Sequence, residues 1–191
     1  EKNKLDGIDL DFEWAENEKE YKDYSLAILK MREVLGDKYL FSVSLHPVCY
    51  KISKEAIEAV DFISLQCYGP SPVRFPIEKY CSDIQMVLEY GIPKEKLVAG
   101  VPFYGVTKDN SKKTEAYFNF VQNGLVTSPA QNEVIYQGDT YVFDGQDNIR
   151  IKTRYAKEQK LKGMMSWDLA TDLPLSDSRS LLKTMTEELR E

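Results

Sequence analysis

The sequence predicts an α/β fold built on a parallel sheet. Short apolar runs that alternate with polar residues are separated by amphipathic segments of helical period, and the connections between them are short. This order is typical of βαβ units, in which a helix crosses back over the sheet between one strand and the next. Five such strands fit either an open doubly wound sheet or part of an eight-stranded barrel of ~250 residues, and the alternation alone does not separate the two.

The strands are expected at 5–14, 39–45, 62–68, 97–103 and 163–167. The first alternates strictly from residue 7, which is the period of a strand. Helices are expected at 17–35, 54–60, 76–91, 152–161 and 177–189. In the longest of them, Tyr24, Ile28, Met31 and Leu35 recur at helical spacing, and Gly36 stands where a C-terminal cap belongs.

Residues 105–150 interrupt this alternation. They are polar and contain short β-like runs at 133–136 and 140–143 beside Gly-Asp and Asp-Gly turn signals. We therefore predict a small insertion in the loop after the strand at 97–103, with the Lys-rich tract 108–113 as a solvated loop.

Composition excludes several classes of protein. The 191 residues include 25 Lys and Arg against 31 Asp and Glu, which gives a net charge of −6, and 42% are hydrophobic. An acidic chain is a poor partner for nucleic acid, and no stretch approaches the ~20 apolar residues of a membrane span. The three cysteines, an odd number, form neither a disulfide framework nor a metal-binding spacing. We expect a monomer that binds neither nucleic acid nor membrane.

The first strand carries a row of acids. Because side chains alternate, Asp9, Asp11 and Glu13 share one face at ~6.6 Å intervals. The apolar residues at 8, 10, 12 and 14 share the other face, and we expect the first three of them to be deeply packed. Neighbouring carboxylates raise one another's pKa, and burial raises it further. Such a row suits acid and base chemistry, whereas an Mg²⁺ or Ca²⁺ site is less favoured because a straight strand spreads its oxygens apart. A solvated edge strand is the third interpretation.

Residues 6–13, DGIDLDFE, fit the DGxDxDxE signature of glycoside hydrolase family 18, the chitinase family. Further segments resemble later strands of that family: FISLQCY at 62–68, LVAGVPFYG at 97–105 and GMMSWD at 163–168. The resemblance implies a (β/α)8 TIM barrel, of which this chain would supply the C-terminal five βα units. Residues 1–191 would then be the C-terminal part of one catalytic domain within a longer protein, and 105–150 a small insertion after strand 7.

The resemblance also implies an activity, the retaining hydrolysis of β-1,4-linked N-acetylglucosamine polymers, in which the substrate's own acetamido group is the nucleophile. Glu13 would be the acid and base, Asp11 would hold the acetamido N–H, and Asp9 would share a proton with Asp11. Tyr68 would donate to the acetamido oxygen, and Trp167 would stack under the reacting sugar.

Further substrate contacts are implied for Gln66, Tyr104 and Asp6, with Gln66 bonding the acetamido group or Asp11. The sequence departs from the common family pattern at Gly69, where many members carry Asp, and at Val106, where Arg is frequent. His46 is expected to be a surface residue in the loop after the second strand.

The partner implied is a carbohydrate that contains N-acetylglucosamine, with no cofactor or metal, in a secreted or extracytoplasmic setting. Rival functions are an endo-β-N-acetylglucosaminidase that acts on N-glycans or peptidoglycan, and a non-catalytic lectin of the same fold. Lectins of this kind typically lose the catalytic Glu. A metal-dependent hydrolase that uses the three acids of the first strand is the remaining alternative.

Overall fold

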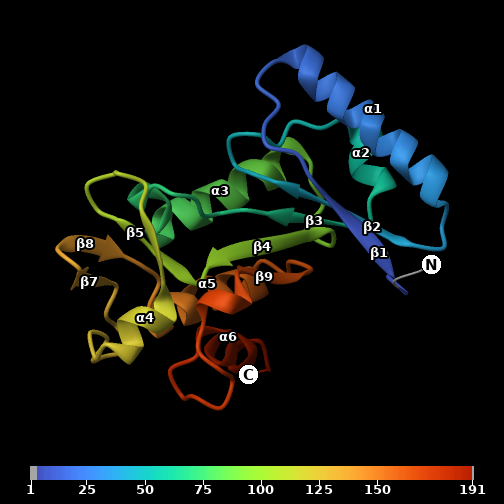
Figure 1. The fold of residues 1–191 in the computed structure, drawn as a ribbon. Coiled ribbons are helices and arrows are strands. Elements are labelled where there is room, and N and C mark those ends of the chain that lie inside the picture. Colours follow the sequence, from blue (N-terminus) through green and yellow to red (C-terminus); the bar gives the residue numbers. More distant parts are fainter. Residues whose placement is uncertain (1–3, 191) are drawn as a thin grey trace.

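The computed structural model describes residues 4–190 and shows a mixed α/β fold with a parallel sheet (Figure 1). All neighbouring strands of this sheet run parallel, in the order β1-β2-β3-β4-β9. The strands are β1 (Gly7–Asp11), β2 (Leu40–Leu45), β3 (Phe62–Leu65), β4 (Leu97–Pro102) and β9 (Gly163–Trp167). The helices that connect and follow them are α1 (Glu18–Leu35), α2 (Lys54–Ala59), α3 (Ile77–Tyr90), α5 (Gln146–Glu158) and α6 (Leu181–Arg190).

A second, antiparallel sheet with the order β6-β5-β8-β7 lies between β4 and α5 in the chain. Its elements are β5 (Tyr104–Thr107), β6 (Thr114–Ala116), α4 (Tyr117–Gln122), β7 (Glu133–Tyr136) and β8 (Asp139–Val142). In Figure 1 it lies on the side toward which the arrows of β3 and β4 point. The antiparallel sheet therefore stands beside the carboxyl ends of the parallel strands. Two short 3-10 helices, Pro72–Arg74 and Leu169–Thr171, follow β3 and β9.

Local capping explains why α1 matches the sequence prediction, whereas α5 and α6 do not start where they were predicted; α6 begins at Leu181 rather than 177. Asn17 caps α1 by accepting a hydrogen bond from the Glu20 amide at 3.1 Å, and the Glu20 carboxylate accepts one from the Glu16 amide at 2.7 Å. By contrast, α5 begins at Gln146, six residues before the predicted start at 152, and ends at Glu158 rather than 161. Its N-cap is Gly145, which has no side chain to signal the start.

Alternation along the strands separates an apolar face from a polar one. In β3 and its extension, Ile63, Leu65 and Cys67 are buried among the helices, while Gln66 and Tyr68 lie on the opposite face. The same pattern in β2 and β4 builds one continuous core with residues of α1, α3, α5 and α6. Burial of this face stabilises the fold and leaves the other face of the sheet available for polar side chains.

The apolar face of β1 is less covered than the sequence predicts. Ile8 is 38% exposed and Phe12 43%, so the expectation that they are deeply packed is wrong. Within residues 4–190, β1 pairs only with β2 and forms an edge of the sheet. Phe12 packs against Tyr24 of α1 at 5.1 Å between ring centroids, which covers one side of it.

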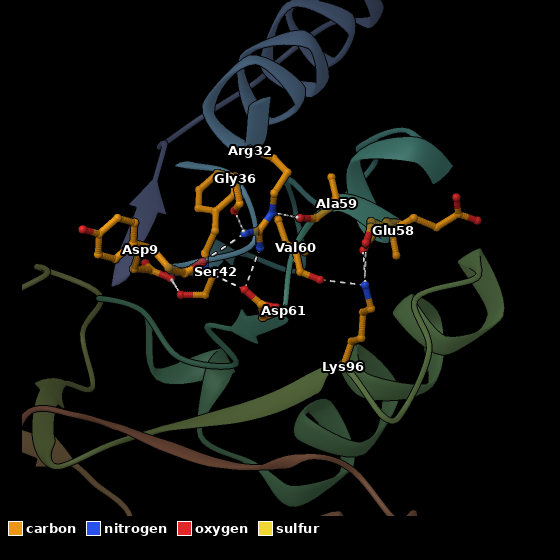
Figure 2. A network of polar contacts seen from close by, with 12 residues as sticks. Asp9, Arg32, Gly36, Ser42, Glu58, Ala59, Val60, Asp61 and Lys96 are labelled. Carbon is orange, nitrogen blue, oxygen red and sulfur yellow. Dashed lines mark hydrogen bonds and ion pairs between the residues drawn. The ribbon is translucent and has the colours of Figure 1, made fainter. Parts of the chain in front are cut away.

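Polar contacts tie the amino ends of β2, β3 and β4 to the ends of α1 and α2 (Figure 2). The Arg32 guanidinium pairs with Asp61 at 2.6 Å and donates to backbone carbonyls, including that of Ala59 at 2.7 Å. Lys96 donates to three carbonyls around the end of α2, the shortest bond being 2.6 Å to Val60. These cations satisfy carbonyls that a helix end leaves without a partner in the helix. No helix described between residues 4 and 190 combines the length and apolar character that crossing a bilayer requires.

Candidate active site

A pocket of about 220 Å³ lies at the carboxyl ends of the parallel strands. These ends carry the catalytic groups in barrel enzymes because the loops that follow the strands gather there. Six of the eight residues predicted for the site line this pocket, namely Asp11, Glu13, Gln66, Tyr68, Tyr104 and Trp167. The other lining residues are Trp14, His46, Gly69 and Pro70. Side chains from the ends of β1, β3, β5 and β9 thus meet at one place.

Asp11 is the acid of the pocket that the fold perturbs most clearly. Burial raises the pKa of its carboxyl group, and the nearby charge of Asp9 raises it further. Gln66 donates to the Asp11 carboxylate at 3.1 Å, which opposes both effects. This contact is one of the two that the sequence suggested for Gln66, and it fixes the Asp11 carboxylate toward β3.

Asp9 lies one step deeper on β1 and outside the pocket lining. One of its carboxylate oxygens accepts a hydrogen bond from Ser42 at 2.5 Å (Figure 2). The other accepts one from Ser44 at 2.8 Å, and both serines belong to the neighbouring strand β2. The register pairs Asp9 with Ser42, so these side chains share a face. These two bonds hold the Asp9 carboxylate against β2. Asp6 precedes β1 at the far end from the pocket, so its location gives no support to the predicted sugar contact.

Aromatic side chains form another part of the pocket. Tyr68 is buried and its hydroxyl donates to the Met165 sulfur at 3.6 Å. Burial raises the pKa of the Tyr68 phenol, so it stays a neutral donor. The ring of Tyr104 meets that of Tyr68 edge-on at 6.4 Å. Trp167 is 54% exposed, which leaves much of its indole uncovered for a ligand to contact.

Comparison with known proteins decides the family. The sequence profile of glycosyl hydrolases family 18 matches residues 1–172. The chain belongs to this family. Among curated proteins, it is 23% identical to "Probable chitinase 2" of Drosophila melanogaster over 90% of this chain and 48% of that protein. It is 24% identical to "Class V chitinase CHIT5b" of Medicago truncatula over 88% of this chain and 59% of that protein. The chain thus spans about half the length of the curated relatives it matches.

Solved structures of family 18 share the fold. The chitinase ChiB from the chitin utilization locus of Flavobacterium johnsoniae matches with a TM-score of 0.79 and 28% identity, over 98% of this chain and 61% of that one. A chitinase-like agglutinin from Robinia pseudoacacia matches with a TM-score of 0.73 and 18% identity, over 98% and 68% of the two chains. The fold is therefore that of family 18 chitinase structures.

The structure adds two pocket residues that the sequence analysis placed elsewhere: Trp14, which alternation assigned to the face opposite the acids, and His46. His46 is only 8% exposed and lines the pocket, so its assignment to the protein surface is wrong. The signal was its position directly after β2, beside the end of the acidic strand. Gly69, a departure from the common family 18 pattern, lies next to it: a Cβ at Gly69 would be 3.8 Å from the His46 Nε2 atom.

Between residues 4 and 190, no three carboxylate, imidazole or thiol groups gather closely enough to hold an ion. The cysteines in this part of the chain are free thiols, and the pKa of Cys67 is raised by burial. Asp9 and Asp11 lie two residues apart on β1, and Glu13 lies in the loop beyond it.

Proposed function

We propose that this protein hydrolyses β-1,4-linked polymers of N-acetylglucosamine, such as chitin and its oligosaccharides. The observation that carries the proposal is the gathering of Asp11, Glu13, Tyr68 and Trp167 around one pocket. An acid pair, a neutral phenol and an exposed indole are the groups that an N-acetylated sugar needs for protonation, orientation and stacking. The family assignment and the chitinase relatives support the same chemistry.

In the proposed reaction, Glu13 protonates the glycosidic oxygen as its bond to the anomeric carbon breaks. The carbonyl oxygen of the substrate's acetamido group attacks that carbon from the opposite side and forms an oxazolinium ion. The Asp11 carboxylate accepts the acetamido N–H and stabilises the positive charge, while the charge of Asp9 and its bonds to two serines keep Asp11 oriented. Water then attacks the anomeric carbon, Glu13 takes the proton, and the configuration is retained.

The remaining pocket residues bind and orient the sugar. Tyr68 donates its hydroxyl proton to the acetamido oxygen, exchanging its weak bond to sulfur for one to the substrate. Trp167 stacks under the sugar ring, and Tyr104 contacts the next sugar. Gln66 holds Asp11 in the orientation that receives the acetamido N–H.

We further propose that the parallel sheet belongs to a (β/α)8 barrel, of which the chain is the C-terminal part with residues 105–150 as an insertion. The share of the relatives' length that the chain spans supports this. We also propose that the protein acts as a monomer. We propose that it acts outside the cytoplasm, because polymeric chitin does not cross membranes.

Fold similarity does not choose between hydrolysis and binding, because an agglutinin shares it. The retained Glu13 in the pocket favours hydrolysis. The test is Glu13→Gln in the full-length protein, assayed on chito-oligosaccharides beside a high-mannose glycopeptide. We expect turnover to fall by about 10²–10⁴-fold while sugar binding survives, since a general acid contributes on that scale. Unchanged turnover would remove Glu13 as the acid, and cleavage of the glycopeptide alone would move the substrate to N-glycans.

Substrate assistance has a separate test. A thiazoline analogue of the oxazolinium ion should inhibit competitively, because it resembles the intermediate. Absence of inhibition in an active enzyme would point to a protein nucleophile instead.

A further inference from the structure

We propose that His46 is a positioning residue that holds the ends of β1 and β3 in fixed relation, and with them Glu13 and Tyr68. The inference rests on the proposed function and deepens it, because it concerns the same pocket. His46 follows β2, which lies between β1 and β3 in the sheet. Its ring is therefore placed between the two strands whose ends carry these groups.

The hydrogen bonds of the His46 ring specify its tautomer. The Val48 amide donates to the Nδ1 atom at 3.2 Å, so Nδ1 carries no proton. The Nε2 atom, 3.1 Å from the Tyr68 carbonyl oxygen, then carries the proton and donates it to that carbonyl. One neutral ring thus ties the loop after β2 to the residue that we assign to the acetamido oxygen.

The same ring contacts the loop that carries Glu13. Trp14, the next residue after Glu13, meets the imidazole edge-on at 4.5 Å between ring centroids and 81° between planes. A second contact lies beside it: the Ala15 amide donates to the Cys49 sulfur at 3.2 Å. Cys49 and His46 are themselves joined by backbone hydrogen bonds in both directions, at 2.7 and 3.3 Å. The loop after β1 is therefore held at two points by the loop after β2.

His46 does not suit proton transfer in the reaction. Burial lowers its pKa to about 4, and the positive charge of Arg74 lowers it further. The Tyr68 carbonyl and the charge of Asp83 raise the pKa of His46, and the positive charge of Lys79 lowers it. Since both ring nitrogens are bonded and the ring is neutral at pH 5–8, His46 acts through the groups it holds.

Misplacement of a reacting group by about 1 Å can cost about 100-fold in rate. Loss of the His46 contacts would free both the backbone of Tyr68 and the ring of Trp14. We therefore expect replacement of His46 to lower kcat far more than it raises KM, because the sugar-stacking surface of Trp167 is not touched.

The experiment compares three variants in the full-length protein. His46→Gln keeps an N–H near the Nε2 position, His46→Asn is too short to reach the Tyr68 carbonyl, and His46→Ala removes all contacts. On chito-oligosaccharides, we expect kcat to fall about 10- to 100-fold for Asn and Ala with KM within about threefold, and to recover to within about fivefold of wild type for Gln. Equal losses for Gln and Asn, or no loss in any variant, would overturn the proposal.

Two control variants separate positioning from general stability. Lys51→Ala alters an exposed side chain of the same loop and should leave kcat unchanged. Ile63→Val removes a methylene group from the buried face of β3 and should cost about 0.5–1.5 kcal/mol of stability without loss of kcat. If Ile63→Val lowers kcat as much as His46→Asn does, the effect is one of stability and the proposal fails.

A fluorescence measurement tests the contact independently of activity. In a Trp167→Phe background, Trp14 is the sole tryptophan of this sequence. Its quenching by acrylamide should increase on His46→Asn and less on His46→Gln. Identical quenching in both would overturn the proposed contact. If the wild-type protein binds chito-oligosaccharides without cleaving them, the proposed hydrolysis fails, yet the quenching result still decides whether His46 positions the pocket.

Discussion

A buried ion pair between the end of the antiparallel sheet and α5 should be the contact whose loss costs the most stability. Lys152 of α5 and Asp144, which follows β8, meet at 2.6 Å, and neither side chain is exposed. Asn148 adds a bond to the carboxylate at 3.2 Å. The Lys152 ammonium also lies 5.5 Å from the ring centre of Tyr80 and 5.9 Å from that of Phe75. The pair thus joins the end of the antiparallel sheet to α5 and to the aromatic residues near α3.

Replacing Lys152 by Met keeps the length of the side chain and removes its charge. Breaking a buried pair by removing one partner costs about 3–5 kcal/mol, because the other charge is left without compensation. That is a large part of the roughly 5–15 kcal/mol that stabilises a typical domain. For a chain of this size, the loss corresponds to a fall in Tm of about 6–20 °C.

The measurement is urea unfolding followed by circular dichroism, with Arg150→Met as the matched control. Arg150 lies on the same helix and pairs with Asp147 at 2.7 Å, but both side chains are substantially exposed, so its loss should cost under about 1 kcal/mol. Adding Asp144→Asn to Lys152→Met should recover part of the loss, because no buried charge then remains. A loss for Lys152→Met no larger than that for Arg150→Met would refute the reasoning.

Two further predictions concern β1. Asp9→Asn should lower the pKa of Asp11, because the Asp9 charge opposes ionisation of Asp11, and Gln66→Met should raise it, because the Gln66 hydrogen bond favours ionisation. Titration of the Asp11 carboxyl group by ¹³C NMR measures both pKa shifts. Shifts of the same sign in the two variants would contradict the assignment. Gly7→Ala should destabilise the fold by about 1–3 kcal/mol, since the added Cβ would lie 2.1 Å from the Leu40 carbonyl oxygen of β2. Amide hydrogen exchange along β1 and β2 measures the effect, and unchanged exchange would show that the two strands do not separate.

The sequence predicted the start of α1 and the end of α3 from local end signals, but it missed the start of α6 at Leu181, which Ser180 caps by accepting from the Lys183 amide. The cap at Asn17 and the glycine at Gly91, which takes a left-handed φ of 113°, mark the ends of α1 and α3. The start of α5 carried no such signal, because Gly145 offers no capping side chain and the residues that follow are polar. Local pattern is informative about boundaries only where the chain itself satisfies the free groups of a helix end.

Part of the candidate site could be predicted because strand alternation, like a helix cap, is a local signal in the sequence. Strand alternation fixed the face on which Asp11 lies, and the acid row made that face recognisable. The contact between Gln66 and Asp11 joins residues 55 positions apart, so it depends on the order of strands rather than on spacing. The burial of His46 was not predicted because it depends on residues from other loops, namely Trp14 after β1 and Tyr68 after β3.

The arrangement of the three acids also explains why the fold alone cannot distinguish a hydrolase from a lectin. Asp9 is held by two serines of β2 and Asp11 by Gln66 of the β3 end, so the sheet itself accommodates their charges. A protein that only binds sugar could keep both for the stability of this polar face. Glu13 lies beyond the last residue of β1, in the loop that lines the pocket. The stability of the sheet therefore does not require an acid at that position, which makes Glu13 the residue whose presence bears most directly on hydrolysis.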